Sequence, residues 1–288
     1  MMVNVRQALI SLGKLLTCAL ALEIGTIIGG IIAVALKLPI PKSPAGADMK
    51  SIQLYMLLVT PLYALALAIV ARGLRGNFLA RTLILFSLAW VSYTLNTELE
   101  ASIVSTYATG IWFALISAIP AALFCAAATA YFFPVGEPVK EAVAAMKEFF
   151  SSRSFLDWVW RFVLAAVAFM PIYFVFGLMV LPFTGEYYRQ SMFGLAMPTL
   201  QQLLPTLFAR SVLFSLVCLP ILILWNKSNL SLFWNLGLAL FLLVGFIYMM
   251  ISTWLPLYVR FPHTLEMLAD EFVYAGALVL LIAKRNPA

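Results

Sequence analysis

The sequence predicts an all-α fold: a polytopic integral membrane protein, built as a helical bundle of about eight transmembrane helices with both termini cytoplasmic. Three observations favour this fold. Of the 288 residues, 64% are hydrophobic and only 10% are charged, a composition far from that of water-soluble domains. The hydrophobic residues form long runs bounded by Pro, Gly and charge, and most runs reach the roughly 20 residues that a bilayer core requires. Lys and Arg are concentrated in alternate loops.

Eight apolar runs are candidates for the spans of a single transmembrane domain that covers residues 1–288. The first run is longer than the hydrophobic region of a signal peptide, so we interpret it as a span. The sixth is short, and we expect it to include residues of the preceding loop; seven spans and a re-entrant segment are the alternative. In order, the runs are Leu15–Leu36, Ile52–Ala71, Thr82–Asn96, Tyr107–Phe133, Trp158–Leu181, Ser211–Trp225, Leu230–Tyr258 and Leu265–Ala283.

The basic residues predict the orientation. Because short cytoplasmic loops carry an excess of Lys and Arg, we expect the more basic side, which includes both termini, to be cytoplasmic. This pattern favours a multi-pass protein of the cell membrane. The net charge of +6 then reflects topology, and we expect no nucleic-acid partner. The basic side holds Arg6, Lys14, Arg72, Arg75, Arg81, Lys140, Lys147, Arg153, Arg161, Lys227, Lys284 and Arg285, and the other side holds Lys37, Lys42, Lys50, Arg189, Arg210 and Arg260.

Two stretches outside the runs are predicted to contact the membrane. In residues 137–153, apolar residues such as Val143 and Phe150 share one helical face, which predicts an interfacial amphipathic helix on the cytoplasmic leaflet. Residues 186–210 are too apolar for an ordinary solvated loop, and they contain two prolines. We therefore expect a broken or re-entrant segment on the outer face.

Motifs exclude several classes of soluble enzyme. The chain has no Walker A loop and no GxGxxG, HExxH or GxSxG motif. Cys18, Cys125 and Cys218 each lie within an apolar run and form no CxxC spacing. This pattern predicts buried free cysteines, with neither a disulfide framework nor a thiolate metal site.

The last apolar run begins with an unusual polar stripe. His263, Glu266, Asp270 and Tyr274 are three or four residues apart, so they lie on one face of a helix, and Glu271 falls beside it. Two carboxylates four residues apart repel each other when both are ionised, and burial near lipid makes this less favourable still. Some positive charge is therefore expected nearby.

A second polar group closes the third run. Tyr93, Asn96 and Glu100 are predicted to share one face, with Glu98 pointing elsewhere. By the predicted orientation, the end of the third run, Glu186 and the start of the eighth run are on the same outer side. Three segments that are distant in sequence therefore bring acids to one membrane depth.

Three sources of positive charge are open for these acids. A divalent metal, Zn, Mn or Fe(II), suits a site of one nitrogen and several oxygen ligands. The candidate ligands are His263, Glu266, Asp270 and Glu100. Protons could neutralise the carboxylates and form an ion or proton pathway. The arginines that could instead form a purely structural salt-bridge network are Arg189, Arg210 and Arg260.

A bound metal would make the protein a membrane-embedded enzyme. We expect metal-activated water to hydrolyse a lipid or lipid-linked substrate at the outer leaflet, or to support transfer from it. Glu98 or Glu271 is the expected general base, because no Ser or Cys is paired with one. Arg189 is expected to bind a phosphate or carboxylate head group, and Asn96 and Tyr274 are further predicted substrate contacts.

Glu23 is a carboxyl group near the middle of the first run. Gly25 and Gly29 follow it at a spacing that permits close helix contact. We expect Glu23 to be protonated and hydrogen-bonded across a helix pair, or to belong to a relay. If Glu23 lines a cavity that reaches the outer acids, a secondary transporter that couples ions or protons through its carboxylates becomes the better hypothesis. A non-catalytic membrane subunit is a further alternative.

Overall fold

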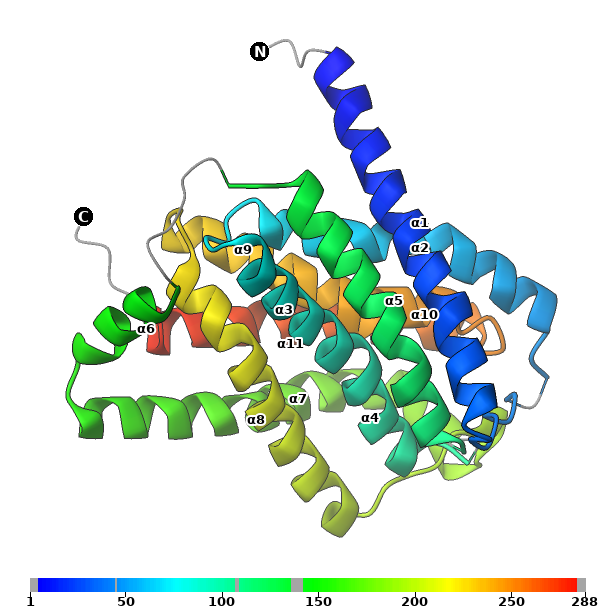
Figure 1. Cartoon of the computed structure of the whole chain (residues 1–288). Coiled ribbons are helices and arrows are strands. Elements are labelled where there is room, and N and C mark those ends of the chain that lie inside the picture. Colours follow the sequence, from blue (N-terminus) through cyan, green and yellow to red (C-terminus); the bar gives the residue numbers. More distant parts are fainter. Residues whose placement is uncertain (1–4, 45, 107–108, 136–141, 284–288) are drawn as a thin grey trace.

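The computed structural model describes residues 5–44, 46–106, 109–135 and 142–283, and it is an all-α bundle (Figure 1). Seven of its helical segments are long and apolar enough to cross a membrane, so the chain is a multi-pass membrane protein. The eighth predicted run lies in a 25-residue helix that also carries Arg260, Glu266, Asp270 and Glu271. In chain order the elements are α1 (Val5–Ala35), α2 (Met49–Ala71), α3 (Phe78–Ala89), η1 (Trp90–Leu95), α4 (Asn96–Val104), α5 (Ile111–Phe132), α6 (Ala142–Ser151), α7 (Phe155–Arg189), η2 (Met192–Gly194), α8 (Leu200–Leu224), α9 (Asn229–Leu240), η3 (Phe241–Phe246), α10 (Ile247–Ile251) and α11 (Leu257–Leu281).

The helix of the sixth span begins before the predicted apolar run Ser211–Trp225. Helix α8 begins at Leu200, where Thr199 and Gln202 form a capping box that satisfies the first free backbone N–H groups. The helix therefore includes Arg210 and continues through Pro205. The segment 186–210 is interrupted between α7 and α8: its first residues end α7, its last residues begin α8, and residues 190–199 form the linker.

The predicted interfacial helix corresponds to α6, and its residues 137–141 lie outside the described residues. Phe149 is buried and its ring lies 4.8 Å from that of Trp158 at the start of α7. Val143 is 74% exposed and Phe150 37% exposed. The apolar face of α6 therefore splits between contact with the bundle and an open apolar surface.

Basic side chains close the helix ends at one end of the bundle, here called the basic end. Arg81 donates to the carbonyl oxygens of Ala71 at the end of α2 and of Ala130 in the last turn of α5, both at 2.9 Å. Arg161 donates to the carbonyl oxygen of Leu281 at the end of α11, and Arg153 to those of the two residues that follow Leu281. Lys14 donates to Phe132 O of α5 at 3.1 Å. Helix C-termini leave carbonyls without partners and carry partial negative charge, so cations stabilise them.

The opposite end is held by backbone contacts between loops. Ser105 and Leu195 form an isolated antiparallel bridge, which joins the end of α4 to the linker between α7 and α8. Thr106 N donates to Gly194 O at 2.8 Å, and Ala196 N donates to Val104 O at 2.7 Å. This contact fixes the end of α4 relative to α7 and α8, which is the position of the site described below.

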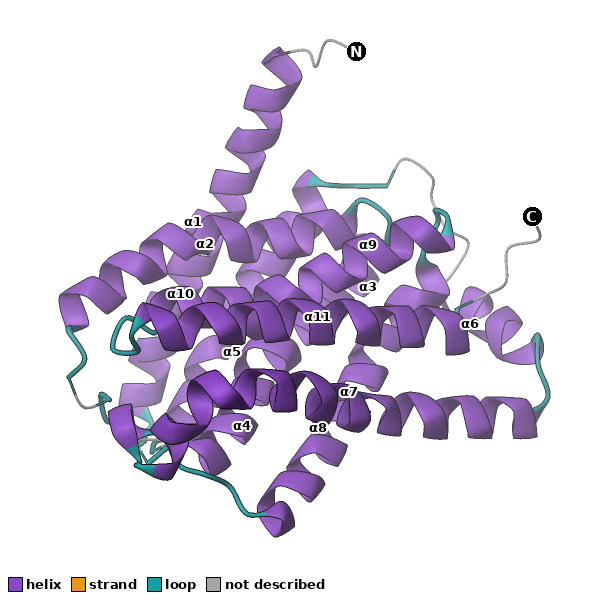
Figure 2. Cartoon of the chain, turned by 180° about the vertical axis from the view of Figure 1, so that it is seen from behind, coloured by secondary structure: helices purple, strands orange, loops and turns teal. Residues whose placement is uncertain are grey.

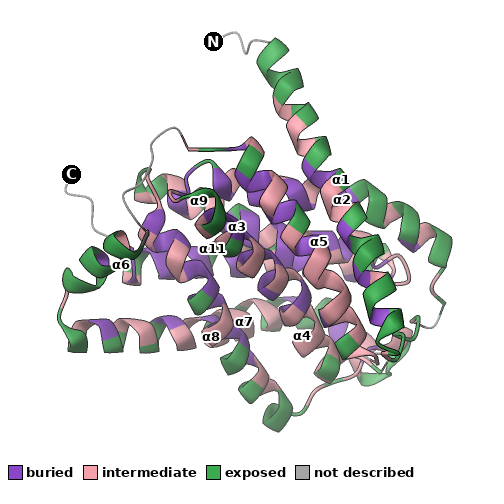
Figure 3. Cartoon of the chain, viewed as in Figure 1, coloured by how far each residue is buried: buried purple, intermediate pink, exposed green. Residues whose placement is uncertain are grey.

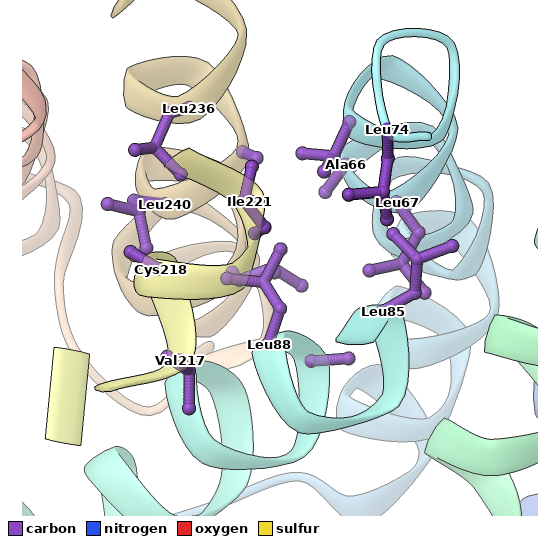
Figure 4. Close-up of a cluster of buried hydrophobic side chains, with 14 of the residues drawn as sticks. Ala66, Leu67, Leu74, Leu85, Leu88, Val217, Cys218, Ile221, Leu236 and Leu240 are labelled. Carbon is purple, nitrogen blue, oxygen red and sulfur yellow. The ribbon is translucent and has the colours of Figure 1, made fainter. Parts of the chain in front are cut away.

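The core is formed where α2, α3, α8 and α9 meet. Figure 4 shows Leu67, Leu88, Cys218, Ile221 and Leu240 packed together, and all five are fully buried. The three cysteines are free and buried, as the sequence predicts. Around this core, α1 and α7 present long exposed apolar surfaces (Figure 3). Such surfaces are unfavourable in water and suit a hydrocarbon surrounding.

Helices α7 and α11 pack along each other, as Figure 2 shows from the far side. The face of α11 that carries Glu266, Asp270 and Glu271 is buried against the bundle. Since three acids occupy the buried face of one helix, the groups opposite them decide what this region can do.

Candidate functional site

Two π-helical turns face each other in the middle of the bundle. The η1 turn interrupts the α3–α4 helix and the η3 turn interrupts the α9–α10 helix, and the two turns are in contact. A π turn inserts an extra residue and changes the direction of the side chains that follow it; such turns are frequent at functional sites. Each turn lines one of the two cavities described next: Val244 of η3 lines the first, and Tyr93 and Thr94 of η1 line the second.

The acid cavity is a space of about 80 Å³ between α4, α7, α8, α10 and α11. Helix α11 supplies His263, Glu266, Asp270 and Glu271, and α4 supplies Glu100. The polar ends of the third and eighth runs, which are far apart in sequence, therefore meet. Arg210 of α8 lines the same cavity, as do Tyr173 and Tyr188 of α7.

Arg210 is the central cation of this cavity. Its side chain is only 3% exposed, and its Nη1 lies 3.0 Å from Glu100 Oε1. Its Nε donates to Asn96 Oδ1 at 2.6 Å. The guanidinium also stacks over the rings of Phe169 and Tyr173, at 5.3 and 5.6 Å from their centroids. Arg210 is thus held on three sides, as expected for a buried planar cation.

His263 is held through both ring nitrogens. Its Nδ1 lies 2.7 Å from Glu266 Oε2, one helical turn along α11. Its Nε2 lies 3.3 Å from the hydroxyl of Tyr188, which approaches from α7. The tyrosine and the carboxylate together fix the ring, and the histidine is oriented toward these partners.

Asp270 and Glu271 are buried more deeply than the other acids. They are 4% and 1% exposed. One oxygen of each, Asp270 Oδ1 and Glu271 Oε2, has no hydrogen-bond partner among the described residues. Arg210 is the sole Lys or Arg among the described residues that line the cavity, whereas four carboxyl groups line it. The cavity therefore has unmet capacity for positive charge, because an ionised carboxylate is strongly disfavoured when buried without a partner.

A second, larger space adjoins the acid cavity and is here called the Glu23 cavity. It has a volume of about 340 Å³ and lies between α1, α2, α5, α10 and the α3–α4 helix. Glu23 of α1 lines it and accepts a hydrogen bond from Thr60 Oγ1 of α2. Thr97 and Tyr248 line both cavities, so the two spaces are neighbours.

The remaining predicted site residues fall in different places. Glu98 lines the Glu23 cavity and not the acid cavity. Arg189 is largely exposed and pairs with Glu186 at 3.1 Å, outside both cavities. Tyr274 is fully buried one turn beyond the cavity, with its hydroxyl 3.0 Å from Ser215 Oγ. Asn96 binds Arg210 through its side-chain oxygen.

The predicted metal ligands lie in one cavity but face different partners. Glu100 is paired with Arg210, and His263 with Glu266 and Tyr188. In the described ranges, no three side chains of His, Cys, Asp or Glu are grouped so that they could hold a metal ion. The metal ligation of these residues stays a prediction.

Sequence reasoning gave too little weight to several aromatic and hydroxyl groups. Tyr188 fits the pattern of an interface aromatic, yet it contacts His263. Thr60 and Tyr63 have no polar neighbours in sequence that would single them out, and they become part of a site only because α1 and α2 meet. Comparisons with protein-family models, with curated proteins and with solved structures found no match.

Proposed function

We propose that the protein is a secondary transporter of the cell membrane, in which buried carboxyl groups couple substrate passage to protons. The observation that carries this proposal is the adjacency of the two cavities. Through Thr97 and Tyr248, acids near one end of the bundle adjoin Glu23, which lies near the middle of the first span. Intramembrane acids that line connected polar space are typical of ion and proton pathways.

The charge of the acid cavity supports the same proposal. One guanidinium faces four carboxyl groups, and two carboxyl oxygens are buried without partners. A proton or a cation that enters the cavity would give these carboxyl oxygens a partner. When it leaves, the carboxyl groups are again buried without a partner, which is unfavourable. A site of this kind binds and releases positive charge as its surroundings change.

Helix irregularities beside both cavities supply places where the bundle can bend. Pro61 follows Thr60 in α2, and Pro262 precedes His263 in α11. A proline inside a helix removes one backbone hydrogen bond and is a common cause of kinks. The α3–α4 and α9–α10 helices contain the π turns, so each cavity borders at least one helix with an irregular hydrogen-bond pattern. Alternating access requires such flexible points.

Proton flux in reconstituted vesicles tests the proposal. Purified protein is reconstituted into liposomes that contain a pH-sensitive dye, and gradients of organic cations, organic anions and neutral solutes are imposed in turn. We expect at least one class to drive proton movement, and Asp270→Asn with Glu271→Gln to abolish it. Glu186→Gln removes an exposed carboxyl outside both cavities and should leave the flux unchanged. Absence of flux for every class, or full flux in the double variant, would overturn the proposal.

The metal-dependent enzyme predicted from the sequence has its own test. It requires Glu100, His263 and their neighbours to turn away from their present partners and toward one ion. Elemental analysis of the purified protein against His263→Ala distinguishes the two hypotheses. Stoichiometric metal that is lost in the variant would favour the enzyme acting on a lipid or lipid-linked substrate.

A further inference from the structure

We propose that the Glu23 cavity is a binding site for a small organic cation, such as an alkyl or aryl ammonium compound. Its volume of about 340 Å³ falls within the roughly 300–1,000 Å³ of typical ligand sites. The cavity is separate from the acid cavity, and its walls come from five different helical segments. It is the larger of the two spaces, and its chemistry differs from that of its neighbour.

The charged groups of the cavity are all of one sign. Glu23 and Glu98 line it, and none of its described lining residues is Lys, Arg or His. In the acid cavity, Arg210 partly neutralises the carboxylates, whereas here no basic side chain does so. A cation that enters the Glu23 cavity would therefore meet attraction and no competing protein cation. An anion would meet repulsion.

Aromatic rings supply the second half of the recognition chemistry. Tyr63, Tyr93 and Tyr248 line the cavity, and the rings of Tyr63 and Tyr93 meet edge to face at 5.3 Å. Ring faces attract organic cations, and quaternary ammonium ligands are commonly bound this way. The remaining walls combine Thr and Ser hydroxyls with apolar side chains, and small residues such as Ala118 and Ala121 suit the alkyl part of the ligand.

Thr60 positions Glu23 in either protonation state. The single hydroxyl proton of Thr60 has two acceptors, Met56 O at 2.8 Å and Glu23 Oε1. If Glu23 is neutral, Thr60 donates to Met56 O and its hydroxyl oxygen accepts a hydrogen bond from the carboxyl O–H. If Glu23 is ionised beside a cation, Thr60 donates to the carboxylate.

Cation binding stands on the cavity alone; that the cation is the transported substrate rests on the proposed function. Binding is measured by calorimetry in a non-ionic detergent, with benzyltrimethylammonium as the probe. Neopentylbenzene is its neutral isostere, and benzenesulfonate is an anion of similar size. We expect saturable binding of the ammonium probe alone. Absence of saturable binding, or equal binding of the neutral isostere, would overturn the cation site and indicate an apolar cavity.

Variants locate the site. Glu23→Gln keeps the shape and the Thr60 contact, and we expect it to weaken binding at least about tenfold, since the partner of a desolvated charge is removed. Glu186→Gln should bind as the wild type does, and unchanged melting temperatures establish that both variants fold. If Glu23→Gln binds the ammonium probe with the wild-type affinity, the proposed cation site is wrong.

The two proposals can fail separately. Ammonium binding without any solute-driven flux leaves the cation site and overturns transport. Flux driven only by an anion or a neutral solute, and abolished by Asp270→Asn with Glu271→Gln, leaves transport and overturns the cation as its substrate.

Discussion

Arg210 holds the acid cavity together at the level of single residues. It is buried, and it connects Glu100 and Asn96 of α4 to α8. Removing one member of a buried ion pair leaves the other charge without a partner, and this is more destabilising than removing both members. The arginine therefore stabilises the fold in addition to setting the charge of the site.

We expect Arg210→Gln to lower the free energy of unfolding by about 2–3 kcal/mol. This is less than the roughly 3–5 kcal/mol of a fully buried pair, because the Glu100 side chain keeps 21% exposure. Combining it with Glu100→Gln should give a smaller loss than the sum of the two single losses. Thermal unfolding of the four proteins in detergent measures this, and strict additivity would show that the two side chains do not interact.

At the scale of elements, the contact between α1 and α5 depends on glycine. An added Cβ at Gly29 would lie 1.8 Å from the carbonyl oxygen of Ser117, and one at Gly25 would lie 2.5 Å from Pro120 O. Gly30, next in sequence, has no atom within 4 Å of such a Cβ. The close approach that positions Glu23 is thus possible because two small residues face α5.

We expect Gly29→Ala to destabilise the protein by about 1–3 kcal/mol or more, because the backbone of α5 must move. Gly30→Ala is the matched control and should cause no loss, since alanine is the better helix former. Melting temperatures in detergent compare the two variants. A Gly29→Ala variant as stable as Gly30→Ala would mean that α1 and α5 are farther apart than described.

The π turn in the third span explains one error of the helical-face argument. A regular helix places Tyr93, Asn96 and Glu100 on one face, with Glu98 elsewhere. The η1 turn changes the register between Tyr93 and the residues after it. Tyr93 instead lines the Glu23 cavity together with Glu98, while Asn96 and Glu100 meet Arg210.

For the whole molecule, the distribution of charge predicts how the chain is threaded. The loop between α8 and α9 lies at the basic end, since Asn226 N donates to Gly73 O beside Arg75. Lys42 lies at the other end, where its backbone N donates to Thr109 Oγ1. Lys227 in the α8–α9 loop and Lys42 are both exposed, and they therefore mark opposite ends of the bundle.

Cysteine labelling measures the orientation directly, because the three native cysteines are buried. We expect Lys42→Cys to react with a membrane-impermeant maleimide in intact cells. Lys227→Cys should react only after the cells are permeabilised. Labelling in the reverse pattern would show that the termini are outside.

The sequence predicts the features that depend on local patterns, and it does not predict those that depend on how distant helices pack. The spans follow from runs such as Ile52–Ala71, because bilayer thickness fixes their length. The sequence predicts that the sixth span extends into the preceding loop, but it does not locate the start of α8, because Pro205 and Arg210 interrupt the apolar pattern. The acids of α11 are recognised as one stripe, yet their pairing with Arg210 depends on how α8 packs, which no local pattern contains.

The arginines at the basic end join two properties that are usually considered separately. Arg81 belongs to the charges that are predicted to orient the chain during insertion, and it also closes the ends of α2 and α5. Moving that charge to another loop position could keep the insertion signal but would leave carbonyls open in the folded bundle. A substitution that removes the orientation signal at Arg81 would therefore also remove contacts that hold the assembled helices together.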